Sequence, residues 1–201
     1  MRPSSLVLTS SWHDRIPTPP VETAMLLETK RIVLRPFRLE DAEAAFAMNQ
    51  DPRVSRFIPQ ESSATIEEVR QPMKQITLND YEKYGYGSLA LVGKNDGHFM
   101  GFAGLKFLPD LQEVDLGYRL IHKDWGQGFA TEAAQALVRY GFETLGLNRI
   151  IAMAFLDNTR SIRVMKKSAM RYWKAIQHAG HKVVVYQFTG PSPVLRATQS
   201  P

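Results

Sequence analysis

The feature that most constrains this chain is a glycine-rich turn between a strand-like run and a helix-like run. Residues 122–133 read His-Lys-Asp-Trp-Gly-Gln-Gly-Phe-Ala-Thr-Glu-Ala. They follow an alternating segment, Glu113 to Ile121, that predicts a β-strand, and they open a helical pattern that extends to about Leu145. Gly126 and Gly128 let backbone approach a ligand closely, and the first N–H groups of a helix carry the positive end of its dipole. The pattern predicts a phosphate or pyrophosphate site, although it also suits a plain tight turn.

Composition places the chain among soluble globular proteins. Its 201 residues suffice for one domain with a substantial core, and 44% hydrophobic with 22% charged residues is ordinary for that class. No run approaches the roughly 18 apolar residues of a membrane helix, so no membrane association is expected. The absence of cysteine excludes disulfides, thiolate metal sites and cysteine nucleophiles. We expect a cytoplasmic protein without a metal.

Positive charge is concentrated in the C-terminal third. The net charge is +5, but the segment from Arg149 to Lys182 holds eight basic residues against the single acid Asp157, which is +7 and leaves −2 for the remainder. Such a segment indicates cofactor phosphates, RNA or a solvated surface. Direct nucleic-acid binding is not expected, because no aromatic-rich RNA-binding signature accompanies the basic residues.

The chain divides into one domain and two tails. Residues 1–24 are rich in Pro, Ser and Thr without periodicity and predict a disordered extension, with Met25 as an alternative start. The domain spans 25–189, and 190–201 form a C-terminal tail. Strands are predicted at 31–35, 87–93, 98–107, 113–121, 148–156, 172–177 and 183–188. Helices are predicted at 39–50, 65–81, 129–145 and 157–169, and a kink or break is expected at Pro72 in the second of them. Residues 53–63 are predicted to form a loop.

The order of elements predicts a mixed α/β (α+β) fold. A helix between the strands 113–121 and 148–156 requires a parallel pair within an otherwise antiparallel sheet. The glycine-rich turn then lies at the carboxyl end of a sheet strand, where ligands bind in open α/β sheets. Gly117, in the middle of its strand, is a candidate bulge or point of close approach.

Several motifs together resemble the GNAT superfamily of acetyltransferases. The opening residues 29–36, Thr-Lys-Arg-Ile-Val-Leu-Arg-Pro, with Asp51-Pro52, are most similar to its RimJ/RimL branch, which acetylates the N-termini of ribosomal proteins. The similarity covers about Glu28 to Thr189. The motifs that carry it are Gly117-Tyr118, Trp-Gly-x-Gly-x-Ala-Thr-Glu-Ala at 125–133, Asn148-Arg149-Ile150 and Asn158-Thr159-x-Ser161-Ile162-Arg163-Val164.

The resemblance implies a GNAT-type acyl-CoA acyltransferase fold with a splayed parallel strand pair, opened by a bulge near Gly117, and acetyl-CoA as the acetyl donor. The family binds the CoA pyrophosphate on Q/R-x-x-G-x-G/A, and here Trp125 replaces the usual Gln or Arg. The strand end Leu120-Ile121 is the implied edge for the pantetheine amides, with a backbone N–H near Ile121 for the oxyanion. The implied pyrophosphate cradle comprises Gly126, Gln127, Gly128, Phe129, Ala130 and Thr131.

The following helix contributes further implied site residues. Asn158 matches a family Asn that hydrogen-bonds the pantetheine arm, and Ser161 matches a Ser proposed to protonate the departing thiolate; both also suit a helix N-cap and first turn. Arg160, Arg163 and Lys167 recur at helical spacing. We expect Arg163 to reach the 3′-phosphate of CoA, with a solvated basic face as the alternative.

One segment departs from the family pattern. Where the family has Lys-Leu-Gly-Phe, residues 167–170 read Lys-Ser-Ala-Met. The missing glycine changes the turn into the next strand and leaves its path open. A non-catalytic acyl-CoA-binding sensor therefore remains an alternative to an enzyme.

Two carboxylates are candidates for the catalytic base, because an amine attacks a thioester only when it is unprotonated. Glu113 and Asp115 share one face of a strand at i, i+2, and neighbouring carboxylates raise each other's pKa. Glu113 is slightly preferred, an exposed acidic strand face is the alternative, and Tyr118 competes with Ser161 as the acid.

No motif in the sequence identifies the acceptor amine. We expect a protein or peptide N-terminal amine, with a small amine such as a polyamine, amino acid or aminoglycoside as the alternative, and a monomer or homodimer. The loops expected to select the acceptor are 53–63 and 177–182, where His178 and His181 flank Gly180.

Overall fold

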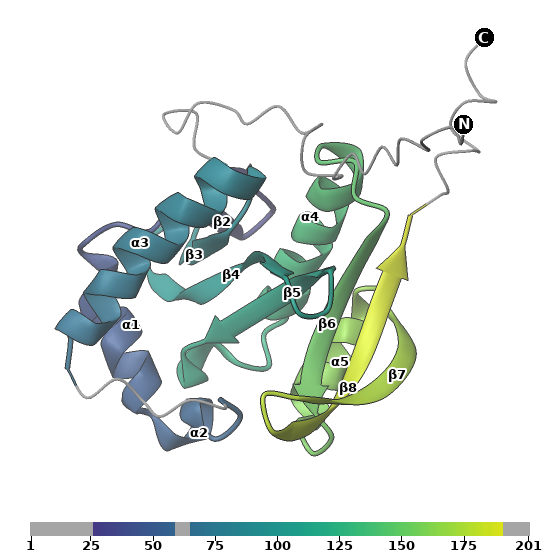
Figure 1. Cartoon of the computed structure of the whole chain (residues 1–201). Helices are drawn as coiled ribbons and strands as arrows, with labels where there is room; N and C mark the ends of the chain where they lie inside the picture. The colour runs from purple at the N-terminus through teal and green to yellow at the C-terminus, as the bar shows by residue number, and fades with distance from the viewer. Residues whose placement is uncertain (1–25, 59–64, 191–201) are drawn as a thin grey trace, which may run out of the picture.

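The computed structural model describes residues 26–58 and 65–190 (Figure 1). The predicted N-terminal extension and all but the first residue of the predicted C-terminal tail lie outside these ranges. None of the helices in the described ranges is long and apolar enough to cross a membrane.

A single mixed sheet organises the described residues, with strand order β1-β2-β3-β4-β5-β6-β8-β7. Neighbouring strands are antiparallel except β5 and β6, which are parallel, as the sequence predicted. The strands are β1 (Leu27–Glu28), β2 (Ile32–Arg35), β3 (Ser88–Gly93), β4 (Phe99–Leu108), β5 (Glu113–Leu120), β6 (Arg149–Phe155), β7 (Arg171–His178) and β8 (His181–Thr189).

Helices cover both faces of the sheet (Figure 1). On one face, α1 (Asp41–Gln50) and α3 (Glu67–Tyr84) pack through Ala45, Val69 and Phe99. On the other face, α4 (Phe129–Glu143) and α5 (Thr159–Lys167) enclose the larger core, which includes Leu137 and Met165. The apolar stripe of each helix is therefore buried against the sheet.

The structure corrects several local predictions. The predicted loop 53–63 begins as a short helix, α2 (Pro52–Ser55), because the side chain of Asp51 accepts a hydrogen bond from Arg53 N and Pro52 occupies the first turn. Helix α3 continues through Pro72 without a break, since Val69 and Met73 anchor it in the core on either side. β1, which the sequence did not predict, pairs with β2.

The segment that departs from the family pattern, whose path the sequence left open, turns at Ala169. Ala169 has a φ of 62°, the left-handed conformation that glycine adopts without cost. The chain thus passes from α5 into β7 through a left-handed residue, with some backbone strain at Ala169.

The two edges of β5 differ in how they pair with their neighbouring strands. Towards β4, β5 is paired continuously from Glu113 to Leu120, without a register shift at Gly117. Towards β6, one bridge joins the strands, between Asp115 and Ile151. The predicted bulge at Gly117 is therefore wrong. β5 itself is regular, and beyond this bridge it is not paired with β6; the unpaired part of this edge is called the slot below.

Candidate active site

The glycine-rich turn forms a backbone cradle at the start of α4. Gly126 and Gly128 have φ values of 79° and 87°, which glycine adopts freely, and Gly128 caps the helix. Within the described part of the chain, no backbone N–H from Gly126 to Thr131 donates a hydrogen bond. These free N–H groups at the positive end of a 15-residue helix suit a phosphate or pyrophosphate.

Trp125 connects this cradle to the end of β5. Its indole Nε1–H donates to the carbonyl of Leu120 at 2.8 Å, and its ring lies 4.9 Å from that of His122. The guanidinium of Arg160 lies over the Trp125 ring, 5.0 Å from the indole centroid. Trp125 thus joins β5, the cradle and α5, a role the sequence pattern did not indicate.

The predicted pantetheine edge is already partly hydrogen-bonded. The N–H of Ile121 donates to Met100 O at 2.8 Å, so this group is not free to hold an oxyanion. The carbonyl of Ile121 accepts from Asp124 N at 3.0 Å. The carbonyls of Leu120 and Ile121 each accept one hydrogen bond already and can each accept a second from a ligand amide.

Asp115 places a carboxylate at the single bridge between β5 and β6. Its Oδ1 is inaccessible to solvent and has no partner among the described residues, while the carboxyl accepts a hydrogen bond from Met153 N–H. Burial raises the pKa of Asp115 from 3.8 to about 7, although the charge of Lys106 and the Met153 bond act to lower it. The group therefore changes protonation near neutral pH, as a catalytic base does.

Glu113 lies two residues earlier on the same strand face and has a partner. Arg149 Nη1 approaches Glu113 Oε1 at 3.5 Å. Burial raises the pKa of Glu113, against the charges of Arg149 and Lys174, which lower it. Glu113 lies beyond the bridge, away from the diverging ends of the strands, and the bridge lies between it and the slot.

Three polar residues connect β5 to the start of α5 on the other side of the slot. Tyr118 Oη lies 2.8 Å from Ser161 Oγ and donates to Ser161 O at 3.0 Å. Asn158 Oδ1 accepts from Ser161 N at 3.1 Å, so Asn158 is the N-cap of α5. Burial raises the pKa of Tyr118, which keeps its hydroxyl protonated and able to donate. Both proposed acids thus belong to one hydrogen-bonded pair.

Two basic residues of α5, Arg160 and Arg163, have different environments. Arg160 packs on Trp125, beside the cradle. Arg163 is exposed and forms no hydrogen bond or ion pair with the described residues, so its role toward CoA stays a prediction.

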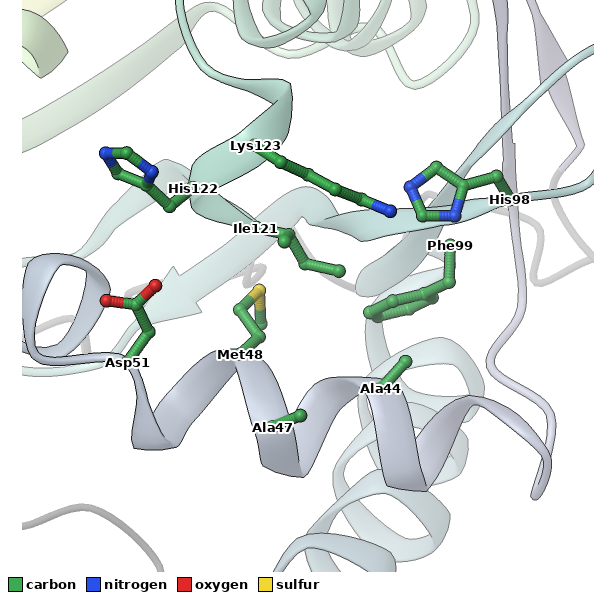
Figure 2. Close-up of a pocket in the computed structure, with 9 residues that line it drawn as sticks. All are labelled: Ala44, Ala47, Met48, Asp51, His98, Phe99, Ile121, His122 and Lys123. Carbon is green, nitrogen blue, oxygen red and sulfur yellow. The ribbon is translucent and has the colours of Figure 1, made fainter.

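A pocket of about 510 Å³ lies beside the end of β5, on the side of α1 (Figure 2). Its floor is apolar, with Met48 from α1 and Phe99 and Ile121 from the sheet. Its upper edge carries Lys123 and His122. The remaining lining residues are Ala44, Ala47, Asp51 and His98.

Arg119, near this pocket, is a partly buried cation that the sequence analysis did not identify. Arg119 Nη1 donates to Asn49 Oδ1 at 2.8 Å, and its guanidinium lies over Phe102. Burial lowers the pKa of Arg119 to about 10. Its position at i+4 from Asp115 on one strand face was the available signal.

Comparison with known proteins identifies relatives of the whole domain. Residues 31–171 match the acetyltransferase (GNAT) domain family. The uncharacterized N-acetyltransferase YoaA of Bacillus subtilis is 33% identical over 143 residues, covering 71% of this chain and 80% of YoaA. The FsC-acetyl coenzyme A-N(2)-transacetylase of Aspergillus fumigatus is 31% identical over 147 residues, covering 69% of this chain and 62% of that enzyme.

The fold also matches solved structures. RimL, a ribosomal L7/L12 α-N-protein acetyltransferase in complex with coenzyme A, superposes with a TM-score of 0.68 at 18% identity. The match covers 82% of this chain and 98% of RimL. At this identity the likeness concerns the fold.

Proposed function

This chain belongs to the GNAT family and is an acetyl-CoA-dependent N-acetyltransferase, and we propose that its acceptor is the N-terminal α-amine of a protein or peptide. The observation that carries the proposal is Asp115, a carboxylate with a pKa of about 7 at the bridge between β5 and β6. An α-ammonium has a pKa of about 7.7–8.0, whereas a lysine-type ammonium has a pKa of about 10.4. A carboxylate whose pKa is raised towards neutrality is therefore better matched to an α-ammonium than to a lysine-type ammonium.

The cofactor half of the site consists mainly of backbone. The free N–H groups from Gly126 to Thr131 bind the pyrophosphate of acetyl-CoA, helped by the dipole of α4. The carbonyls of Leu120 and Ile121 and the side chain of Asn158 bind the pantetheine arm, which enters between β5 and β6. Arg163 remains a candidate for the 3′-phosphate, and Arg160, fixed against Trp125, lies closer to the cradle.

Acetyl transfer uses a base, Asp115, and an acid, the hydrogen-bonded pair Tyr118–Ser161. Asp115 takes a proton from the acceptor ammonium, and the free amine attacks the thioester carbon, forming the C–N bond. The C–S bond breaks, and the thiolate takes a proton from the pair Tyr118–Ser161. The nitrogen, cationic after the attack, releases its extra proton to solvent, and solvent reprotonates the pair. We assign the base to Asp115 over Glu113 because Glu113 is paired with Arg149 beyond the bridge.

A small molecule that carries an α-amine is the second candidate acceptor. The relative from Aspergillus fumigatus is named an N(2)-transacetylase, which designates one amine of a small molecule. Polyamines are disfavoured on charge, because Arg119 and Lys123 lie on the α1 side of the site and the carboxylate of Asp51 is paired with Arg53.

Release of thiol from acetyl-CoA across matched acceptors tests the proposal. The panel comprises a lysine-free peptide with a free N-terminus, the same peptide with a blocked N-terminus and one lysine, a free amino acid, and spermidine. We expect turnover of the first peptide at pH 7 and little or none of the blocked peptide or spermidine. Preferred turnover of spermidine or of the lysine side chain would contradict the proposal, and turnover of the amino acid alone would favour the second candidate.

A further inference from the structure

Arg31, in the turn between β1 and β2, reaches the cofactor cradle from a distant part of the chain. Its Nη1 donates to the carbonyl of Gln127 at 2.9 Å. Its backbone N–H donates to Glu132 Oε1 at 2.8 Å, and its Nε donates to Glu132 Oε2 at 2.7 Å. The guanidinium also lies 4.5 Å from the centroid of the Phe129 ring. One side chain therefore contacts three residues of the cradle and its helix.

The bond to Gln127 controls the direction of a cradle N–H. A trans peptide is planar, so its C=O and N–H point in opposite directions. Holding the carbonyl of Gln127 against Arg31 turns the N–H of Gly128 away from the guanidinium and leaves it free for a ligand. This restraint matters because the flanking glycines, Gly126 and Gly128, adopt left-handed conformations and resist rotation of the peptide less than other residues would.

Glu132 connects Arg31 to the first turn of α4. An unpaired carboxylate there would repel a pyrophosphate. Thr29 Oγ1 donates to Glu132 Oε1 at 2.6 Å, and Arg31 supplies the remaining donors. Burial acts to raise the pKa of Glu132, but these hydrogen bonds from Thr29 and Arg31 outweigh it and hold the pKa low. The carboxylate is thus ionised, neutralised by Arg31 and directed away from the free N–H groups.

From these contacts we infer that Arg31 is a positioning residue for the cofactor. It fixes the peptide between Gln127 and Gly128 and neutralises Glu132, and so sets the affinity for the pyrophosphate part of acetyl-CoA without taking part in acetyl transfer. The inference rests on the proposed function, because it takes the cradle as the pyrophosphate site. A tether that only attaches the β1–β2 turn to α4 is the competing explanation.

Two thioesters separate these explanations. Acetyl-CoA carries the pyrophosphate, and S-acetylpantetheine lacks it but supplies the same acetyl group. For Arg31→Ala we expect the KM for acetyl-CoA and the Kd for CoA to rise about tenfold to a hundredfold, the effect of losing a charge-assisted hydrogen bond. We expect kcat to stay within about twofold of wild type and the KM for S-acetylpantetheine to be unchanged, because an interaction used only in binding changes KM alone.

Two further variants control the measurement. Lys94→Ala removes a cation that holds the same turn, through Glu28 Oε2 at 3.0 Å and Thr29 O at 3.4 Å, without touching the cradle. It should leave both thioesters unaffected. Arg31→Lys keeps the charge but cannot hold Gln127 and Glu132 at once, and should give an intermediate KM for acetyl-CoA. Arg31→Lys also carries the test if Arg31→Ala does not fold.

The outcomes are distinct. An unchanged KM for acetyl-CoA in a folded Arg31 variant, or an equal loss with S-acetylpantetheine or in Lys94→Ala, would overturn the inference and leave the proposed function standing. A wild-type protein that neither binds CoA nor releases thiol with any acceptor would overturn the proposed function and the inference with it.

Discussion

The two edges of β5 show how one strand serves both structure and chemistry. Along β4, residue pairs continue from Gly101–Leu120 to Leu108–Glu113. Along β6, pairing is reduced to Asp115 with Ile151. The paired edge has its backbone groups satisfied and its side chains packed. The other edge is unpaired except at Asp115, a carboxylate whose Oδ1 has no partner among the described residues.

Mutations at the paired edge and at the unpaired edge of β5 should therefore have different effects. An unsatisfied polar atom is expensive in a packed sheet and is retained where a ligand or a proton completes it. Changes at the closed edge should therefore reduce stability, and changes at the open edge should reduce activity while the fold persists.

Asp115→Asn should give the largest effect on activity. Removal of the base is expected to lower kcat about 10²–10⁴-fold, the usual contribution of general acid–base catalysis. The matched control is Glu113→Gln, which should lower kcat by less than about tenfold because Glu113 is held by Arg149. Steady-state thiol release measures both. A larger loss in the Glu113 variant would reassign the base.

The same substitution should change how stability depends on pH. Asp115 is protonated in the folded state up to about pH 7 but ionises near 3.8 in the unfolded chain. The unfolded state therefore binds fewer protons between these values, and wild-type stability falls as pH rises from about 4 to about 7. Asp115→Asn removes this contribution, so its stability relative to wild type should increase over that window and then level off. Denaturant unfolding at several pH values measures it.

A pair of glycines contrasts a packed position of the sheet with an open one. Gly104 and Gly117 are register partners across β4 and β5. A Cβ at Gly104 would collide with the backbone of Gly87 and Ser88, whereas a Cβ at Gly117 would meet nothing within 4 Å. We expect Gly104→Ala to cost about 1–3 kcal/mol or more of stability. Gly117→Ala should keep its Tm but lower kcat at least about tenfold, because a methyl group displaces the reacting groups. Equal melting temperatures for the two variants would contradict this contrast.

Much of the fold was predictable because its signals are local. Period-two alternation indicated β5, and Gly126 and Gly128 before a helical pattern indicated the cradle. The single bridge at Asp115, the pairing of Glu113 with Arg149 and the reach of Arg31 to Gln127 depend on contacts between distant segments, which no local pattern records. Glu113 and Asp115 share one local pattern, so the sequence alone does not decide which is the base; burial and partners, which distinguish them, are tertiary properties.

The proton donor for the thiolate should show a smaller effect. Ser161→Ala and Tyr118→Phe each remove one member of a hydrogen-bonded pair, and the remaining hydroxyl stays in place. We expect either single variant to lower kcat by about tenfold and the double variant by more, within the range for general acid catalysis. Acetyl transfer from a thioester with a more acidic thiol, which needs less protonation, should recover part of the loss. No recovery would indicate a structural role.

The smallest effect is expected at the turn that leads from α5 to β7. Ala169 holds a left-handed φ of 62°, so Ala169→Gly relieves strain and should stabilise the protein by about 1 kcal/mol. Thermal melting measures the change, and kcat should be unaffected because this turn lies outside the slot. Ala179, with a φ of 47° in the β7–β8 turn, offers a matched position. A loss of stability at Ala169→Gly would contradict the assignment of strain.

The assignment of Asp115 as the catalytic base is tested most directly by the pH dependence of kcat for wild type and Asp115→Asn with a peptide acceptor. At saturating substrates kcat reports ionisations in the enzyme–substrate complex. If Asp115 is the base, wild-type kcat falls about tenfold per pH unit below a pKa near 7, the value set by burial of Asp115. The residual activity of Asp115→Asn then lacks this ionisation. A wild-type profile without an ionisation near 7, or the same ionisation retained in the variant, would contradict the assignment.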